Sequence, residues 1–146
     1  MAAVKIAIFE DEFLLANDLK RQLEQYGYEV VAIFRKAEEG IDFFVSRSGT
    51  EDIPDLVMMD ISLAGKMSGL EAAQIMETRY NVAVIFLTGM SQMDVFEEAF
   101  RKKPHAFLIK PFDIQQALVS VKLAVYIKDI EAQLAACRNG LTGKTP

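Results

Sequence analysis

The sequence predicts an α/β fold: a five-stranded parallel sheet with helices on both faces and an extended C-terminal helix. Two observations support this prediction. Five short, nearly continuous apolar runs alternate along the chain with longer amphipathic stretches, and such runs are typical of parallel strands covered on both faces. Five strand–helix units in 146 residues favour an open, doubly wound sheet with the strand order 2-1-3-4-5.

The apolar runs are the expected strands, and the stretches between them are the expected helices. The strands are predicted over residues 4–9, 30–34, 56–59, 82–87 and 106–109. In the stretch after the first strand, Leu15, Leu19 and Leu23 recur every four residues. That spacing places them on one side of a helix, which would face the sheet.

The last helix is expected to be longer than the sheet needs. Asp113 precedes Gln116 by three residues, a spacing that satisfies free backbone N–H groups at a helix start. The apolar pattern then continues through Ile130 and Leu134, and Gly140 is the first strong stop signal. We therefore expect a globular domain over 1–127, and over 128–146 a helix extension to about residue 137 followed by a mobile tail. The alternative is a helix that frays near Lys128-Asp129, with a disordered remainder.

Composition narrows the classes of protein to consider. The formal net charge of -5 argues against nucleic-acid binding by this chain alone, because a phosphate backbone requires clustered Lys and Arg. No apolar run approaches the roughly 20 residues that cross a bilayer, and no signal peptide is visible. The one cysteine, Cys137, cannot form an internal disulfide. These features predict a cytoplasmic protein without a membrane partner.

Charged and hydroxyl side chains stand where the predicted strands end. The first strand ends in Glu10 and Asp11, the third in Asp60, the fourth in Thr88 and the fifth in Lys110. In a doubly wound sheet these ends share one edge, where ligands bind. Crowded carboxylates repel each other unless a cation intervenes, and Mg²⁺ is the usual intracellular cation with oxygen ligands. Acids, metal, lysine and hydroxyl together suit phosphoryl transfer to a carboxylate.

Each of these residues alone has an ordinary explanation. Asp11 could be a helix N-cap, and Lys110-Pro111 could be a turn. The single histidine, His105, is interpreted as a surface turn residue rather than a ligand. Four strand ends that supply complementary groups are harder to explain by coincidence, and the functional interpretation is therefore preferred.

The order of these residues resembles the receiver domain of two-component response regulators. The resemblance rests on Glu10-Asp11, Asp60, Thr88 and Lys110-Pro111-Phe112, and it covers about residues 3–127. It implies that Asp60 accepts the phosphoryl group. It also implies that Glu10 and Asp11 bind Mg²⁺ together with Asp60, Asp11 directly.

The same resemblance assigns the remaining positions of the site. The backbone carbonyl of Ser62 is the further metal ligand, Thr88 is the switch hydroxyl, and Lys110 pairs with the phosphoryl group and precedes a cis peptide bond at Pro111. Phe107 takes the place of the switch aromatic but lacks a tyrosine hydroxyl. The loop after Asp60 departs from the family pattern, with Ala64 in place of a frequent proline.

The resemblance implies a phosphorylation switch rather than a metabolic enzyme. A histidine kinase or phosphotransfer protein would be the donor, and autodephosphorylation would be slow. Output would pass through protein contacts of the surface formed by helix 4, strand 5 and helix 5. A homodimer through the last helix is a further expectation.

Three other functions fit the sequence less well. A Mg²⁺ phosphatase with an aspartyl nucleophile would carry a second Asp two residues after it, where this chain has Ser62. A flavodoxin-type cofactor domain would need a phosphate-binding first loop, which Glu10-Asp11-Glu12 would repel. A degenerate receiver that only binds partners would not need the complete set of Asp11, Asp60, Thr88 and Lys110.

Overall fold

The sheet of this computed structural model has the predicted order. The structure describes residues 3–63 and 65–143. Its strands run parallel in the order β2-β1-β3-β4-β5. They are β1 (Lys5–Phe9), β2 (Glu29–Phe34), β3 (Leu56–Asp60), β4 (Ala83–Gly89) and β5 (Ala106–Lys110). The fold class and the strand order predicted from the sequence are confirmed.

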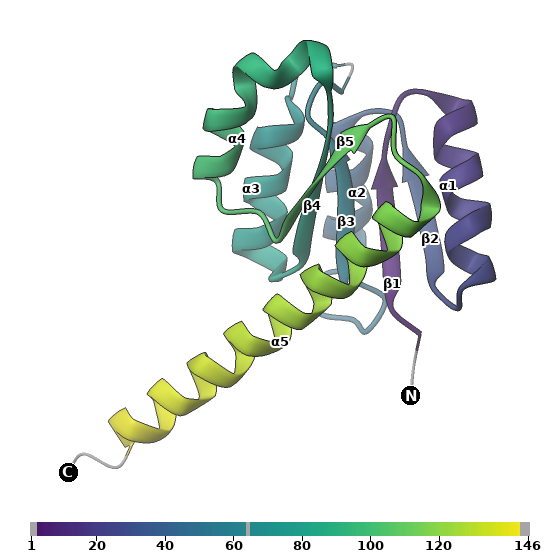
Figure 1. The fold of residues 1–146 in the computed structure, drawn as a ribbon. Helices are drawn as coiled ribbons and strands as arrows, with labels where there is room; N and C mark the ends of the chain where they lie inside the picture. Colours follow the sequence, from purple (N-terminus) through teal and green to yellow (C-terminus); the bar gives the residue numbers. More distant parts are fainter. Residues whose placement is uncertain (1–2, 64, 144–146) are drawn as a thin grey trace.

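Helices cover both faces of the sheet (Figure 1). They are α1 (Phe13–Gln25), α2 (Ala37–Ser46), α3 (Gly69–Tyr80), the 3₁₀ segment η1 (Met90–Val95), α4 (Phe96–Arg101) and α5 (Ile114–Gly143). α1 and α5 pack on one face, and α2, α3 and α4 pack on the other. The fourth connection is split between η1 and a short α4.

The strands are apolar throughout because successive side chains point into two different cores. In β1, Ile6 and Ile8 pack in the core under α1 and α5, whereas Ala7 and Phe9 pack in the core under α2 and α3. All four side chains are fully buried. This two-sided burial explains the continuous apolar runs that predicted the sheet.

α5 extends well beyond the body of the domain (Figure 1). Its start is capped as expected, since Gln116 N donates to Asp113 Oδ1 and Asp113 N donates to Gln116 Oε1. The helix continues through Gly140 to Gly143, so the expected end near Cys137 was wrong. A glycine inside a helix costs only about 1 kcal/mol relative to alanine, which is too little to stop it. The rest of the expected mobile tail, 144–146, lies outside the described residues.

His105 is not the surface turn residue that the sequence suggested. Its side chain is buried at the start of β5, where Nδ1 accepts a hydrogen bond of 3.1 Å from the amide of Val84. Nε2 lies 2.6 Å from Glu131 Oε1 on α5. Because Nδ1 accepts, the proton of the neutral ring is on Nε2 and is donated to Glu131. The histidine thus joins β4, β5 and the first part of the α5 extension.

Within the described residues, no helix combines the length and the apolarity that crossing a membrane would require.

The start of α3 is packed against the backbone of Asp60, which gives a first prediction. A Cβ atom at Gly69 would lie 2.2 Å from the Asp60 carbonyl oxygen, whereas a Cβ at Gly140 would meet nothing within 4 Å. Gly69→Ala should lower the free energy of unfolding by about 1–3 kcal/mol through overpacking. The control Gly140→Ala should leave stability unchanged or raise it by up to about 1 kcal/mol. Urea unfolding measures both, and equal effects would contradict the close packing.

Candidate functional site

Three carboxylates meet at the carboxyl edge of the sheet. Glu10 and Asp11 follow β1, and Asp60 is the last residue of β3, the neighbouring strand. One oxygen from each side chain lies within 4.8 Å of the others. Glu10 and Asp60 are buried, and Asp11 is half-buried. The proximity of Asp11 and Asp60 expected from the strand order is therefore present.

Lys110 at the end of β5 reaches into this cluster. Its Nζ lies 2.5 Å from Glu10 Oε1 and 3.0 Å from Asp60 Oδ2. The peptide bond between Lys110 and Pro111 is cis. The ammonium group thus bridges the two buried acids. When all three carboxylates are ionised, one ammonium leaves two negative charges, which one divalent cation with oxygen ligands would balance.

The pKa values of Glu10 and Lys110 are both raised. Burial raises the pKa of Glu10 from 4.5 to about 7, opposed by hydrogen bonds from Lys110 and the Glu12 amide and reinforced by the charge of Asp60. Burial alone would lower the pKa of Lys110, but the hydrogen bond to Glu10 and the charge of Asp60 outweigh it, so this pKa is raised. Lys110 is therefore held as a cation beside the acids.

The second oxygen of Asp60 is held by Ser62. Asp60 Oδ1 accepts hydrogen bonds from the Ser62 amide at 2.9 Å and from the Ser62 hydroxyl at 3.1 Å. These contacts orient the carboxylate, with Oδ2 toward Lys110 and Oδ1 toward the loop after β3. The sequence assigned only the carbonyl of Ser62 to the site and missed this role of its hydroxyl and amide.

Thr88 is on β4, and Phe107 is on the neighbouring strand β5. Thr88 is buried, and its hydroxyl donates to the carbonyl of Gly89 at 3.3 Å. Phe107 is half-buried, with its ring centroid 5.8 Å from that of Phe86 and 4.8 Å from that of Phe96. Phe107 thus packs between the sheet and the η1–α4 segment.

Glu38 fixes the loop that follows Asp60. Its Oε1 accepts hydrogen bonds from the amides of Lys66 at 3.0 Å and Met67 at 2.8 Å. Hydrogen bonds from the amides of Glu38 itself, Met67 and Lys66 lower the pKa of this carboxyl group, so it stays ionised. The sequence gave no sign of this contact, because α2 and the loop are far apart in the chain.

Two cations that the sequence analysis passed over lie at the mouth of the site. A hollow of about 470 Å³ is lined by Asp11, Arg35, Lys36 and Glu39. Arg35 and Lys36 follow β2, the strand next to β1. The hollow at this edge therefore has two cations and two carboxylates in its lining.

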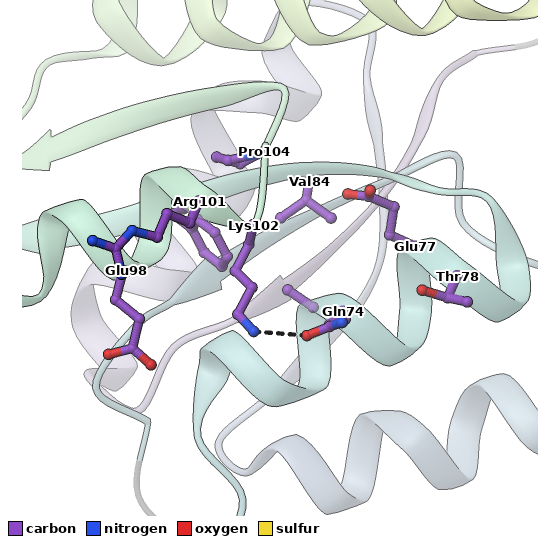
Figure 2. A pocket seen from close by; sticks show the side chains of 10 residues that line it. Gln74, Glu77, Thr78, Val84, Glu98, Arg101, Lys102 and Pro104 are labelled. Atoms are coloured by element: carbon purple, nitrogen blue, oxygen red, sulfur yellow. Dashed lines mark hydrogen bonds between the residues drawn. The ribbon is translucent and has the colours of Figure 1, made fainter.

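A second hollow lies between α3 and the α4–β5 connection (Figure 2). It encloses about 430 Å³, and across it Lys102 Nζ donates to Gln74 Oε1 at 2.8 Å. Phe86 forms part of its wall and also contacts Phe107. Glu10, Asp11 and Asp60 do not line this hollow, so it is separate from the site described above.

Comparison with known proteins decides the family. Residues 6–122 match the model of the response regulator receiver domain, which covers most of the chain. This chain belongs to that family. Receiver domains are phosphoacceptor switches of two-component response regulators rather than metabolic enzymes. They bind Mg²⁺ at an acidic pocket and interact with histidine kinases or phosphotransfer proteins.

Several relatives show how far the similarity extends. The transcriptional regulatory protein PdtaR of Mycobacterium tuberculosis is 31% identical over 121 residues, covering 83% of this chain and 56% of PdtaR. The chemotaxis protein CheY of Listeria monocytogenes is 31% identical over 122 residues, covering 83% of this chain and 98% of CheY. The chain thus spans about half of PdtaR but nearly all of CheY.

Solved structures agree with this assignment. The signal receiver domain of a modulated diguanylate cyclase from Desulfovibrio desulfuricans superposes with a TM-score of 0.78 at 31% identity, covering 88% of this chain and 98% of that domain. A response regulator receiver domain from Clostridium thermocellum gives a TM-score of 0.74 at 26% identity, covering 87% and 98% of the two chains.

The contact between Glu38 and the loop gives a second prediction. Glu38→Ala removes the acceptor for the Lys66 and Met67 amides, so both should exchange hydrogen several-fold faster than in the wild type. Glu38→Gln keeps an oxygen acceptor of the same reach and should show a much smaller increase. Site-resolved hydrogen exchange measures this. Unchanged exchange in Glu38→Ala would show that the contact does not hold the loop.

Proposed function

We propose that this chain is a phosphorylation-dependent signalling switch in which Asp60 accepts a phosphoryl group from a histidine kinase or phosphotransfer protein, in a Mg²⁺-dependent reaction in the cytoplasm. The observation that supports this is the position of Asp60. Its carboxylate lies beside two acids suited to a divalent cation and also contacts the ammonium of Lys110. Family membership supplies the class of reaction.

Different side chains of the site would have different roles in the phosphoryl transfer. An Asp60 carboxylate oxygen forms a bond to phosphorus as the bond from phosphorus to the donor's imidazole nitrogen breaks, and the nitrogen keeps the electron pair. Asp11, Asp60, Glu10 and the Ser62 carbonyl would hold the Mg²⁺, which would supply positive charge beside the phosphoryl oxygens. Lys110 supplies a further positive charge, and its Nζ lies 3.0 Å from Asp60 Oδ2.

Thr88 and Phe107 would carry the change to the surface. Phe86 pairs with Phe107 across the β4–β5 ladder, and Thr88 lies two residues beyond Phe86. A Thr88 hydroxyl that turns from the Gly89 carbonyl toward a phosphoryl oxygen would change the packing space beside Phe107. We propose the α4–β5–α5 surface as the output face, because Phe107 lies on β5 and packs against Phe96 of α4.

The acid set argues against the two nearest alternatives. A phosphatase needs a general acid beyond the nucleophile, but the residue there is Ser62, whose hydroxyl donates to Asp60 Oδ1. A receiver that only binds partners would not need buried Glu10 and Asp60 next to the half-buried Lys110, because carboxylates are costly to bury.

The proposed acceptor gives a third prediction. Incubation with Mg²⁺ and acetyl phosphate should add the mass of one phosphoryl group to the wild-type chain and none to Asp60→Asn, measured by intact-mass spectrometry. Chelation of Mg²⁺ should suppress the added mass, because the charge of the acids is then unbalanced.

Two further variants separate the roles of the neighbouring groups. Asp11→Asn should require more Mg²⁺ for the same labelling, whereas Asp18→Asn, at an exposed position of α1, is a control that should behave like the wild type. Equal labelling of the wild type and Asp60→Asn would overturn the assignment of the acceptor.

The residue two beyond Thr88 gives a fourth prediction. Met90 is 68% exposed at the start of η1, and its side chain cannot orient a water molecule by strong hydrogen bonding. We expect slow hydrolysis of the acyl phosphate in the wild type. Met90→Gln and Met90→Glu should shorten the phosphoryl lifetime, followed as the decay of the phosphorylated mass after donor removal. A lifetime unchanged or lengthened in both variants would contradict this role.

A further inference from the structure

The part of α5 from Leu123 onward has an exposed apolar seam. Its residues recur at alternating spacings of four and three, and all are exposed: Leu123, Ile127, Ile130, Leu134 and Cys137. This alternation is the heptad pattern of coiled coils, in which positions a and d face the partner helix. Ile127 and Leu134 occupy a, and Leu123, Ile130 and Cys137 occupy d. Among the described residues of α5, no charged side chain stands in the seam.

The body of the domain contacts α5 from a different side. Ala117, Val121 and Ala124 are buried against the sheet, and Glu131 contacts His105. These residues lie about a quarter turn around the helix from the seam. The contact with His105 fixes the direction of the helix relative to the body. The seam therefore faces solvent, with Leu123 and Leu134 about half exposed at 51% and 52%.

We propose that this seam binds the same seam of a second copy of the chain in a parallel, two-stranded coiled coil. A seam with apolar residues at both a and d is complementary to itself under twofold symmetry. The flanking g and e positions of a parallel pair bring Tyr126 beside Glu131 of the second copy, and Gln133 beside Arg138. Neither pair joins like charges, so the flanks permit self-association.

The flanks also determine the number and direction of the helices. The residues at position e already contact the body of the same chain, because Ala124 is buried against it and Glu131 contacts His105. A third helix would need to bury these flanks, so two strands are favoured. An antiparallel pair centred on Ile130 would bring the two Glu131 carboxylates together, which disfavours that direction.

The two bodies fit on opposite sides of such a pair. The symmetry axis runs between the two helices, and each body lies about a quarter turn from the seam. Rotation by half a turn therefore places the second body on the far side of the coiled coil. Cys137, at a d position, would then lie opposite its counterpart across the axis, within reach of disulfide formation.

Sedimentation equilibrium of the full, unphosphorylated chain tests the association, which does not depend on phosphoryl acceptance by Asp60. The mass should rise from 16.3 kDa toward twice that value as the concentration increases from micromolar to hundreds of micromolar. Ile130→Glu should remain a monomer throughout this range. Ala132→Glu adds the same charge on the opposite side of the same helix and should associate like the wild type.

Cross-linking tests the direction of the helices. Mild oxidation should join the wild-type chains through Cys137 into a dimer that a thiol reductant reverses, and Cys137→Ser should give none. The control Cys137→Ser with Ala132→Cys, which moves the thiol to the far side of the helix, should cross-link much less. A wild type that stays monomeric overturns the proposal. Association without cross-linking through Cys137 overturns the parallel arrangement, and equal loss of association in Ile130→Glu and Ala132→Glu overturns the seam.

Discussion

The site depends on one interaction, the bridge that Lys110 makes between Glu10 and Asp60. Buried carboxylates are costly unless a cation accompanies them, and here the cation comes from the opposite side of β3. Glu10 follows β1, Asp60 ends β3 and Lys110 ends β5, so the bridge forms only if these strands lie in the observed order. The ion pairs of the site therefore depend on the order of the strands in the sheet.

The bridge leaves the cluster incompletely neutralised, and this matters for its chemistry. Lys110 contacts Glu10 and Asp60, while Asp11 is the half-buried member of the cluster. The remaining negative charge is thus at the solvent side, where a divalent cation can approach. Ser62 and Glu38 act on the other side, since Ser62 holds Asp60 Oδ1 and Glu38 holds the loop that follows. The Asp60 carboxylate is consequently held in one orientation by Ser62 and Lys110.

His105 connects the sheet to the part of α5 that extends beyond it. Its Nδ1 accepts a hydrogen bond from the amide of Val84 in the sheet, and its Nε2 contacts the Glu131 carboxylate of α5. β5, which carries Lys110 and Phe107, begins one residue later. The sheet, next to the strand that carries Lys110 and Phe107, and the α5 extension are therefore joined by direct contacts of one buried side chain.

The sequence by itself determined the sheet and the membership of the acidic cluster. Apolar periodicity is a local property, and the right-handed connections of parallel strands allow few orders for five units. Once the order is known, the strand ends bring Glu10, Asp11, Asp60 and Lys110 to one edge. Only the tertiary structure decided which of these groups contact each other, because side-chain distances depend on how separate segments approach.

The same reason explains the contacts that sequence analysis missed. Glu38 meets Met67 across 29 residues, and His105 meets Glu131 across 26; no local pattern marks either pair. His105 stands beside Lys103 and Pro104, so its neighbours suggested an exposed turn, but packing against α5 buries it. Gly140 is a helix stop by local preference, yet a penalty of about 1 kcal/mol did not end α5 there. Local signals set the elements of this protein, and packing set their partners.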